Sequence, residues 1–251
     1  MQKTHLKILS YNIQAAMFSE PGYYRYITNS WQQILPHSRQ LNNLNAIAKL
    51  IHHYDIVALQ EVDGGSLRTG FINQVKYLAE QASFNYWHQQ LNRNLGKIAQ
   101  HSNGILSRFI PIKVLNYKLP GLMPGRGAIF FQLGNNHNPL IIVVAHLSLG
   151  ARSQRLQLDF LYELLGEYQH VIVMGDLNCS IKQLSNCSLI TKLGLIPANR
   201  SINTFPSWEP KRNIDHILVS PSISIEHVNI LDIGYSDHLP ISLSIHLPYG
   251  I

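Results

Sequence analysis

Short apolar runs recur along the chain, and several of them stop abruptly at a polar side chain. The clearest run, Val-Ile-Val-Met at residues 171–174, is rich in β-branched residues and predicts a strand buried on both faces. Gly175 permits a sharp turn, so Asp176 and Asn178 are expected together at the carboxyl end of this strand. Taken alone, the stretch is explained equally well by a strand followed by an Asx turn.

The first part of the chain repeats this pattern. Residues 6–12 and 55–61 predict two further strands, which end at Asn12 and Glu61. Between them, apolar residues at helical spacing predict an amphipathic helix over residues 39–53. A glycine-rich loop that carries Arg68 follows the second strand, and another helix is expected from about residue 71.

The middle of the chain has a different rhythm. Strands are predicted at residues 103–108, 112–119, 126–133 and 140–147, and we expect them to form one antiparallel meander. The last of these strands carries His146 near its end. Ser153 is expected to cap the next helix. Its predicted buried side carries Leu156, Phe160, Leu161, Leu164 and Leu165.

The last part of the chain contains a short predicted helix over residues 182–193 and two further strands. Asp215 lies in the first of these strands, and Asp237 and His238 directly precede the second. Both strands therefore place polar side chains beside apolar runs, as the earlier strands do.

Size and composition favour a single domain over residues 1–251. A hydrophobic share of 45% is ample for a core, and the chain contains no repeat or linker-like run. No segment has the apolar length of a membrane span or the pattern of a signal peptide. Cys179 and Cys187 suggest neither a disulfide framework nor a zinc site, so a cytoplasmic monomer is expected. The net charge of +6 favours anionic partners without locating them.

The polar residues at the strand ends have matching chemistry. Each lies beside an apolar run, where an unpaired charge would be costly. Their carboxylate and amide oxygens suit a hard cation such as Mg²⁺ or Mn²⁺, histidines suit a phosphate oxyanion, and a carboxylate can activate water. The set consists of Asn12, Glu61, His146, Asp176, Asn178, Asp215, Asp237 and His238.

The motifs around these residues occur in an order that is known from one group of enzymes. They read Tyr-Asn-Ile, Leu-Gln-Glu-Val, Asn-Gly-Ile-Leu-Ser-Arg, Ala-His-Leu, Gly-Asp-Leu-Asn, Ile-Asp-His and Ser-Asp-His-Leu-Pro. The order resembles the endonuclease/exonuclease/phosphatase superfamily, which includes deoxyribonuclease-I-like enzymes, abasic-site endonucleases, inositol-polyphosphate phosphatases and bacterial sphingomyelinases. The resemblance implies an α/β fold, a four-layer α/β/β/α sandwich in which two mixed β-sheets pack face to face with helices outside. It also implies metal-dependent cleavage of a phosphoester at one edge of that sandwich.

The resemblance further implies a role for each polar residue. Glu61 resembles the main metal ligand, with Asn12 beside it and Asp237 among the metal-binding carboxylates. Asp176 resembles the residue that orients and deprotonates the attacking water, and Asn178 its neighbour that holds the phosphate.

The two histidines and three outer residues complete the expected site. His238 would contact the scissile phosphate with its ring oriented by Asp215, and His146 would contact phosphate or act as a general acid. We expect Arg68 and Arg126 at the mouth of the site, because a guanidinium binds phosphate bidentately, with a solvated loop arginine as the alternative for each. Asn103 of the central motif is the third expected substrate contact.

Two motifs depart from those of abasic-site endonucleases. These enzymes place a tyrosine just before the glycine of the central motif, where this chain has His101-Ser-Asn103. They also have Gln-Glu-Thr-Lys where this chain has Gln-Glu-Val-Asp. Both differences favour the bacterial phosphodiesterase and sphingomyelinase-like branch over abasic-site repair.

The leading hypothesis is a Mg²⁺- or Mn²⁺-dependent phosphodiesterase, and a non-catalytic nucleic-acid-binding relative is the alternative. Carboxylates that face a phosphate argue against a pure binding protein. The basic charge slightly favours nucleic acid as the substrate, whereas phospholipids and small phosphodiesters stay open. The aromatic residues of segment 18–31 suit a nucleobase, a lipid headgroup or simply the packing of their own loop.

Overall fold

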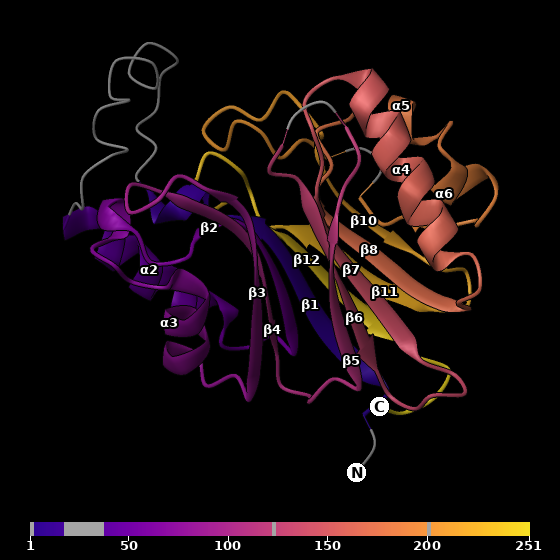
Figure 1. The fold of residues 1–251 in the computed structure, drawn as a ribbon. Coiled ribbons are helices and arrows are strands. Elements are labelled where there is room, and N and C mark those ends of the chain that lie inside the picture. Colours follow the sequence, from indigo (N-terminus) through magenta and orange to yellow (C-terminus); the bar gives the residue numbers. More distant parts are fainter. Residues whose placement is uncertain (1–2, 18–37, 122–123, 200–201) are drawn as a thin grey trace.

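Two mixed six-stranded β-sheets pack face to face, and helices cover their outer faces (Figure 1). This computed structural model describes residues 3–17, 38–121, 124–199 and 202–251. The predicted α/β/β/α sandwich is confirmed. The aromatic segment 18–31 lies outside the described residues.

The first sheet is covered by α2 (Ser38–Ile51) and α3 (Gln74–Gln81). Side chains alternate along its strands, so that Leu9 packs against the helices while Ile8 faces the second sheet. Along the central strands of this sheet both faces are buried, which explains why these strands read as continuous apolar runs. In spatial order the strands are β11 (Ser224–Ile230), β12 (Ile241–His246), β1 (His5–Asn12), β2 (Ile56–Asp63), β4 (Gln100–Ser107) and β3 (Tyr86–Asn94).

The second sheet is covered by α4 (Ala151–Leu165) and by the one-turn helices α5 (Ile181–Leu184) and α6 (Ser188–Thr191). Val143 packs against this helical layer, and its neighbour Ile142 faces the first sheet. In spatial order the strands are β5 (Lys113–Lys118), β6 (Gly127–Leu133), β7 (Leu140–His146), β8 (His170–Asp176), β10 (Asp215–Val219) and β9 (Ile196–Pro197). Two short 3₁₀ helices, η1 (Gln14–Ala16) and η3 (Leu67–Thr69), follow β1 and β2.

The parallel strand pairs decide where the polar residues gather. β1 is parallel to β2 in the first sheet, and β7 is parallel to β8 in the second. The carboxyl ends of all four strands lie at the same edge of the sandwich, which is the upper edge in Figure 1. Below this edge the space between the sheets is filled by aliphatic side chains such as Ile8, Ile142 and Ile172, each contributing roughly 1.5–3 kcal/mol when fully buried.

The prediction of one meander is wrong for its first strand. The segment around residues 103–108 forms β4, which pairs with β2 and β3 in the first sheet. Only β5, β6 and β7 form a meander, and they belong to the second sheet. A strand buried on both faces has the same apolar pattern in either sheet, so the sequence pattern gives no sign of the change of sheet.

Two helix predictions also need correction. The cap of α4 is Gly150 and not Ser153, and Leu156, which was predicted to be buried, is 49% exposed. The reason is that Gln154 and Gln157 turn inward, because their amides bond to buried backbone carbonyls. The single helix predicted over residues 182–193 is in fact the pair α5 and α6. Among the described residues, no helix combines the length and the apolar character needed to cross a bilayer.

Candidate active site

Three polar side chains lie next to one another across the second sheet. The register of β7 with β8 pairs His146 with Asp176, and the register of β8 with β10 pairs Asp176 with Asp215. Directly paired residues on neighbouring strands point to the same face of a sheet. These three side chains are therefore held in one row, and each is less than 8% exposed.

Gly175 keeps this row closely spaced. Its φ is +141°, and a Cβ atom there would lie 2.0 Å from the carbonyl oxygen of Ala145 on β7. Any side chain would force β7 and β8 apart. The glycine thus allows Asp176 to stand directly beside His146.

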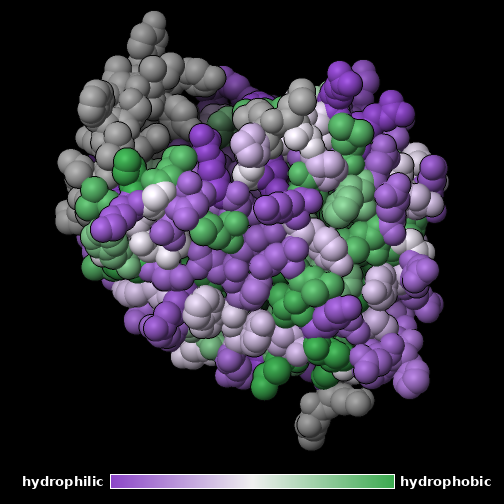
Figure 2. Space-filling view, in the orientation of Figure 1, coloured by the Kyte–Doolittle hydropathy of each residue, from purple (hydrophilic) through white to green (hydrophobic). Residues whose placement is uncertain are grey.

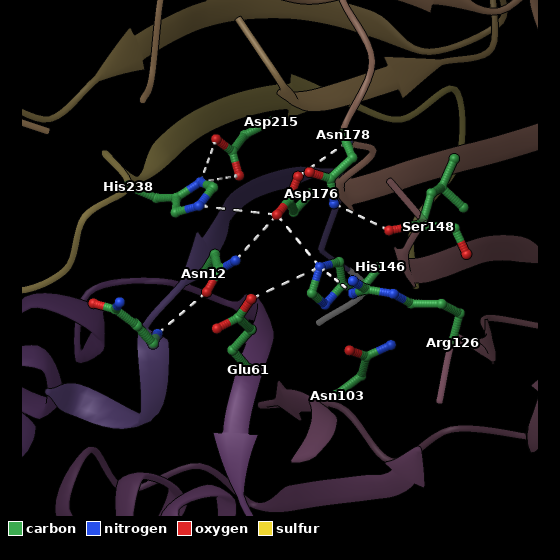
Figure 3. A network of polar contacts seen from close by, with 12 residues as sticks. Asn12, Glu61, Asn103, Arg126, His146, Ser148, Asp176, Asn178, Asp215 and His238 are labelled. Atoms are coloured by element: carbon green, nitrogen blue, oxygen red, sulfur yellow. Dashed lines mark hydrogen bonds and ion pairs between the residues drawn. The ribbon is translucent and has the colours of Figure 1, made fainter. Parts of the chain in front are cut away.

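Asp176 lies at the centre of the polar network in Figure 3. Its Oδ1 accepts the backbone N–H of Asn178 over 3.0 Å, so the Asx turn is present. Its Oδ2 accepts the side-chain N–H of Asn12 over 3.1 Å, a contact that joins the two sheets. The same oxygen lies 3.4 Å from Nε2 of His146 and 3.9 Å from Nε2 of His238.

His238 and Asp215 form a buried ion pair. Nδ1 of the imidazole lies 2.8 Å from Oδ2 of Asp215 and 3.1 Å from Oδ1, and the hydroxyl of Thr204 donates to the same carboxylate. Burial by itself lowers the pKa of His238, but the carboxylates of Asp215 and, less strongly, Asp176 raise it to about 10. Near neutral pH the ring is therefore an imidazolium whose Nε2–H points toward Asp176.

The remaining carboxylates of the site repel one another. Burial, followed by the charges of Asp215 and Glu61, raises the pKa of Asp176 to about 7 although His238 opposes the shift. Burial and Glu61 likewise raise the pKa of Asp237 to about 6. This concentration of negative charge would be relieved by a cation.

Glu61 is aimed into the site by a β-bulge. The register of β2 against β4 shifts between Leu59 and Val62, so that an extra residue of β2 faces β4. Glu61 has a φ of +54°, a conformation that costs a non-glycine residue about 1–3 kcal/mol. Such bulges re-aim side chains near active sites. The carboxylate is 35% exposed and lies 3.9 Å from Nε2 of His146, and no described residue donates a hydrogen bond to it.

The donor groups fit a divalent cation at the first-sheet side of the site. Atoms of Glu61, His146 and Asp176 that could bind a metal lie within 4.8 Å of one another, as do those of Asp176, Asp215 and His238. The carboxylate of Glu61 has free oxygen lone pairs, which hard cations prefer. The imidazole nitrogens are less available, because Nδ1 of His238 is committed to Asp215.

His146 is engaged by Arg126. Nη1 of the arginine lies 2.5 Å from Nε2 of the imidazole, which must accept the hydrogen bond because a guanidinium only donates. Burial, followed by the charge of Arg126, lowers the pKa of His146 well below its usual range. Asn178 has a φ of +52° and donates its side-chain N–H to the carbonyl of Leu147, which leaves its second N–H for a ligand.

Among the other predicted residues, Arg68 lies outside the polar network, whereas Asn103 and Asp237 are buried at the site. Nε of Arg68 lies 2.6 Å from Oδ2 of Asp63, and both side chains are buried, so Arg68 is part of an ion pair beneath the loop and not of the polar network. Asn103 is fully buried and donates to the carbonyl of Gly127 across the two sheets. Asp237 is 4% exposed and accepts a hydrogen bond from Ser236.

A cavity of about 180 Å³ opens beside Glu61 and His146. It is lined also by Asn92, Arg93 and His101, none of which the sequence singled out as functional. These residues come from β3 and the start of β4, and β3 itself was missed because its sequence is polar and does not alternate. The local sequence offered one sign of this part of the site: Arg93 lies three residues before Gly96, as an arginine beside a turn would.

The sequence profile of the Endonuclease/Exonuclease/phosphatase family matches residues 9–238, a span that contains the whole polar network. The chain belongs to the endonuclease/exonuclease/phosphatase family. As a member it is assigned to the phosphoesterases, in agreement with the buried cluster of carboxylates and histidines.

Solved structures share the fold of this chain, and that of an endonuclease/exonuclease/phosphatase protein is among them. A protein of this family from Beutenbergia cavernae is 19% identical, with 98% of this chain and 72% of that chain covered and a TM-score of 0.74. A mannosyl-6-phosphatase from Bacteroides thetaiotaomicron is 17% identical, with 96% and 99% covered and a TM-score of 0.68. The TDP2 protein of D. rerio, complexed with single-strand DNA product, is 17% identical, with 97% and 100% covered and a TM-score of 0.67. No curated protein matches the chain by sequence.

Proposed function

We propose that the protein hydrolyses a phosphodiester by in-line attack of water, with a divalent cation, Mg²⁺ or Mn²⁺, as cofactor. The observation that supports this best is the position of Asp176. Its Oδ2 lies within 4 Å of two histidine nitrogens, while Oδ1 is fixed by the backbone N–H of Asn178. Both oxygens are thus held in place, and Oδ2, which also accepts from Asn12, lies beside the two histidines where a phosphate and a water would meet.

In this proposal Asp176 accepts the proton of the attacking water. Asn12 and Asn178 orient the carboxylate, which general-base catalysis requires before any question of pKa arises. Asp215 holds the imidazolium of His238 so that its Nε2–H can donate to a phosphate oxygen and balance the developing charge.

The opposite side of the site would hold the rest of the phosphate. Arg126 can donate to a phosphate oxygen in place of Nε2 of His146, and the second N–H of Asn178 can do the same. His146, freed from Arg126, could then take up a proton at Nε2 from solvent, and it would contact the phosphate or pass this proton to the leaving oxygen. Glu61, Asn12 and Asp237 would hold the cation, which when bound supplies Lewis-acid polarisation of the phosphoryl oxygen.

The favoured substrate is nucleic acid. The net charge of +6 supports a polyanion, and a relative of the same fold is known in complex with single-strand DNA product. Another protein of the same fold is a mannosyl-6-phosphatase, so small phosphoesters are the alternative substrate class. If several lysines and arginines neutralise phosphates, binding must weaken steeply with salt as counterions are released.

The test is Mg²⁺-dependent turnover of single-stranded DNA, duplex DNA, RNA, phospholipid vesicles and an aryl phosphodiester across a salt series. The proposal predicts hydrolysis of the aryl ester, and of nucleic acid with a steep loss at high salt. Efficient vesicle hydrolysis that tolerates salt would overturn the nucleic-acid assignment. Absence of turnover on all five, with nucleic acid still bound, would favour the non-catalytic binding relative.

A further inference from the structure

The cavity beside Glu61 and His146 lies where the two sheets meet at their edges. Its far side is formed by Asn92, Arg93 and His101, and its floor by Asn103, with Gly125 and Arg126 opposite. We call this cavity the β3–β4 pocket. At about 180 Å³ it has room for several water molecules and extends from Glu61 as far as Arg93.

A second β-bulge builds this pocket. The register of β3 against β4 shifts between Leu91 and Arg93. This bulge lies opposite Ser102 and His101 of β4, one step along the strand from Asn103, which faces the bulge in β2. One bulge aims Glu61 at the reacting phosphate, and the other turns the Asn92–Arg93 corner of β3 toward the same space.

The walls of the pocket are held together from both sheets. Nε2 of Gln90 on β3 donates to the carbonyl of Tyr117 on β5 over 2.8 Å, and His88 lies 2.9 Å from Asn116. Figure 2 shows hydrophilic side chains gathered over the middle of this face. The stem of Arg93 lies over Gly125, where a Cβ atom would come within 2.9 Å of the Cβ atom of Arg93. Because Gly125 has no Cβ atom, the side chain of Arg93 can lie against it at the rim of the pocket.

The charges of the pocket suit an anion. Arg93 and Arg126 both line it, and the only acidic side chain in the lining is Glu61 at the end where the cation would bind. Arg93 forms no ion pair or hydrogen bond through its guanidinium with any residue in the described part of the chain. Burial, followed by the charge of Arg68, lowers the pKa of His101, whereas the carboxylates of Glu61 and Asp63 oppose the shift.

The floor of the pocket offers an unused hydrogen-bond acceptor. Asn103 is fully buried and its Nδ2 donates to Gly127, but its Oδ1 has no partner. A buried acceptor without a donor costs about 1–3 kcal/mol. A sugar hydroxyl that reached this oxygen from the pocket would supply the missing donor.

We propose that the β3–β4 pocket binds a second, non-scissile phosphate of the substrate through Arg93, with a neighbouring sugar hydroxyl donating to Oδ1 of Asn103. The inference deepens the proposed function and rests on it, because the pocket is continuous with the proposed reaction site. Arg126 then lies between the two phosphates. The substrate class is a phosphodiester of a phosphorylated sugar, which includes both nucleotides and phosphorylated hexoses.

Isothermal titration calorimetry with Mg²⁺ present tests this without any need for turnover. The probes are adenosine 3′,5′-bisphosphate against AMP, and glucose 1,6-bisphosphate against glucose 6-phosphate. We expect at least one bisphosphate to bind the wild type tenfold to a hundredfold more tightly than its monophosphate, as one charge-assisted hydrogen bond allows. The probe pair with the larger ratio of bisphosphate to monophosphate affinity shows whether the pocket takes a nucleotide or a phosphorylated hexose.

The variants compare two cations on the same hairpin. Arg93→Gln should reduce the bisphosphate preference to about one, whereas Lys97→Gln should keep it, because Lys97 is exposed and does not line the pocket. In the nucleotide arm, the 2′-deoxy bisphosphate should bind severalfold more weakly than the ribose form if the hydroxyl reaches Asn103.

Two results would overturn the proposal: a wild type that does not distinguish bisphosphates from monophosphates, or an equal loss of preference in both variants. If the wild type preferred bisphosphates but hydrolysed no diester, the proposed function would be contradicted, while the assignment of an anion-binding pocket would still hold.

Discussion

The two sheets contribute to the site in different ways. On the second sheet, His146, Asp176 and Asp215 follow from regular strand register, and each has a hydrogen-bond or ion-pair partner in the fold. On the first sheet, Glu61 stands on a bulge with a positive φ and receives no hydrogen bond from the described residues. Asn103 is likewise left with an unpaired Oδ1. One half is assembled by folding alone, and the other half holds groups that a ligand must satisfy.

This difference has a physical reason. A buried charge must be paired or it destabilises the fold, so the deeply buried second-sheet half has to be complete before any ligand arrives. Glu61 is 35% exposed, and water can satisfy its carboxylate until a cation replaces it. The second-sheet half therefore positions the attacking groups, and the first-sheet half recruits the ligands.

The largest effect is expected in the preassembled half. Asp176→Asn keeps the size of the side chain and one of its two accepting oxygens but removes the proton acceptor. The turnover number for an aryl phosphodiester should fall by about two to four orders of magnitude, the usual contribution of a general base. Thermal unfolding is the control, and the melting temperature should hold or rise because a buried carboxylate that repels Asp215 and Glu61 has gone. Near-full turnover would remove Asp176 from the mechanism.

The ion pair of Arg68 with Asp63 tests whether paired buried charges on the first sheet contribute to stability, as those on the second sheet do. Arg68→Ala leaves the buried carboxylate of Asp63 unpaired, which should cost about 3–5 kcal/mol in the free energy of unfolding. Chemical denaturation measures this cost. If Arg68→Ala left the stability unchanged and raised KM, Arg68 would be a substrate contact and not a structural residue.

The same pair has a pH signature. Burial alone would raise the pKa of Asp63, but the hydrogen bond from Arg68 holds it below its usual value of 3.8. Because the folded pKa is the lower one, the stabilisation is present above pH 3.8 and is lost as the pH falls through the folded pKa. The difference in stability between wild type and Arg68→Ala should therefore shrink only in acid.

Glu61→Gln breaks the ligand-dependent half. The neutral amide keeps the shape of the side chain but weakens cation binding, so turnover should fall by about two to three orders of magnitude at a fixed Mg²⁺ concentration. Calorimetric titration with Mn²⁺ should show weaker binding, and excess chelator should abolish wild-type turnover. Unchanged metal affinity in the variant would place the cation elsewhere.

The smallest effect concerns the coupling of Asp215 to His238. Asp215→Asn and His238→Gln should each be costly, while the double variant should cost little more than the worse single change, because the two act as one unit. The coupling energy is expected within about 0.5–3 kcal/mol. A kinetic double-mutant cycle with fully additive losses would separate the two residues.

The sequence predicted the two halves unequally well. Apolar runs that end in polar residues located β1, β2, β7, β8 and β10, because strand burial leaves a strong local pattern. The bulges left no such pattern, since the positive φ of Glu61 depends on how β2 pairs with β4. Strand β3 was missed for a related reason. Its polar sequence becomes a strand through pairing with β4, and Arg93 was overlooked with it.

Arg68 shows a further limit of the sequence argument. A loop arginine directly after Glu61 has the composition of a phosphate contact, and only the fold reveals that Asp63 turns back beneath the loop to bind it. The pairing of Asp215 with His238, in contrast, was expected from the resemblance to the endonuclease/exonuclease/phosphatase superfamily, and the two side chains do meet although β10 and β12, the strand after His238, belong to different sheets.

The most direct test of the difference between the halves is a Mg²⁺ titration of wild type, Glu61→Gln and Asp176→Asn with an aryl phosphodiester as substrate. We predict that the rate of Glu61→Gln recovers substantially as Mg²⁺ rises, because mass action compensates for a weakened ligand. Asp176→Asn should stay at its low rate at every concentration, because no cation replaces its proton acceptor. Recovery of Asp176→Asn with the same Mg²⁺ dependence as Glu61→Gln, or wild-type turnover that ignores chelator, would contradict the account.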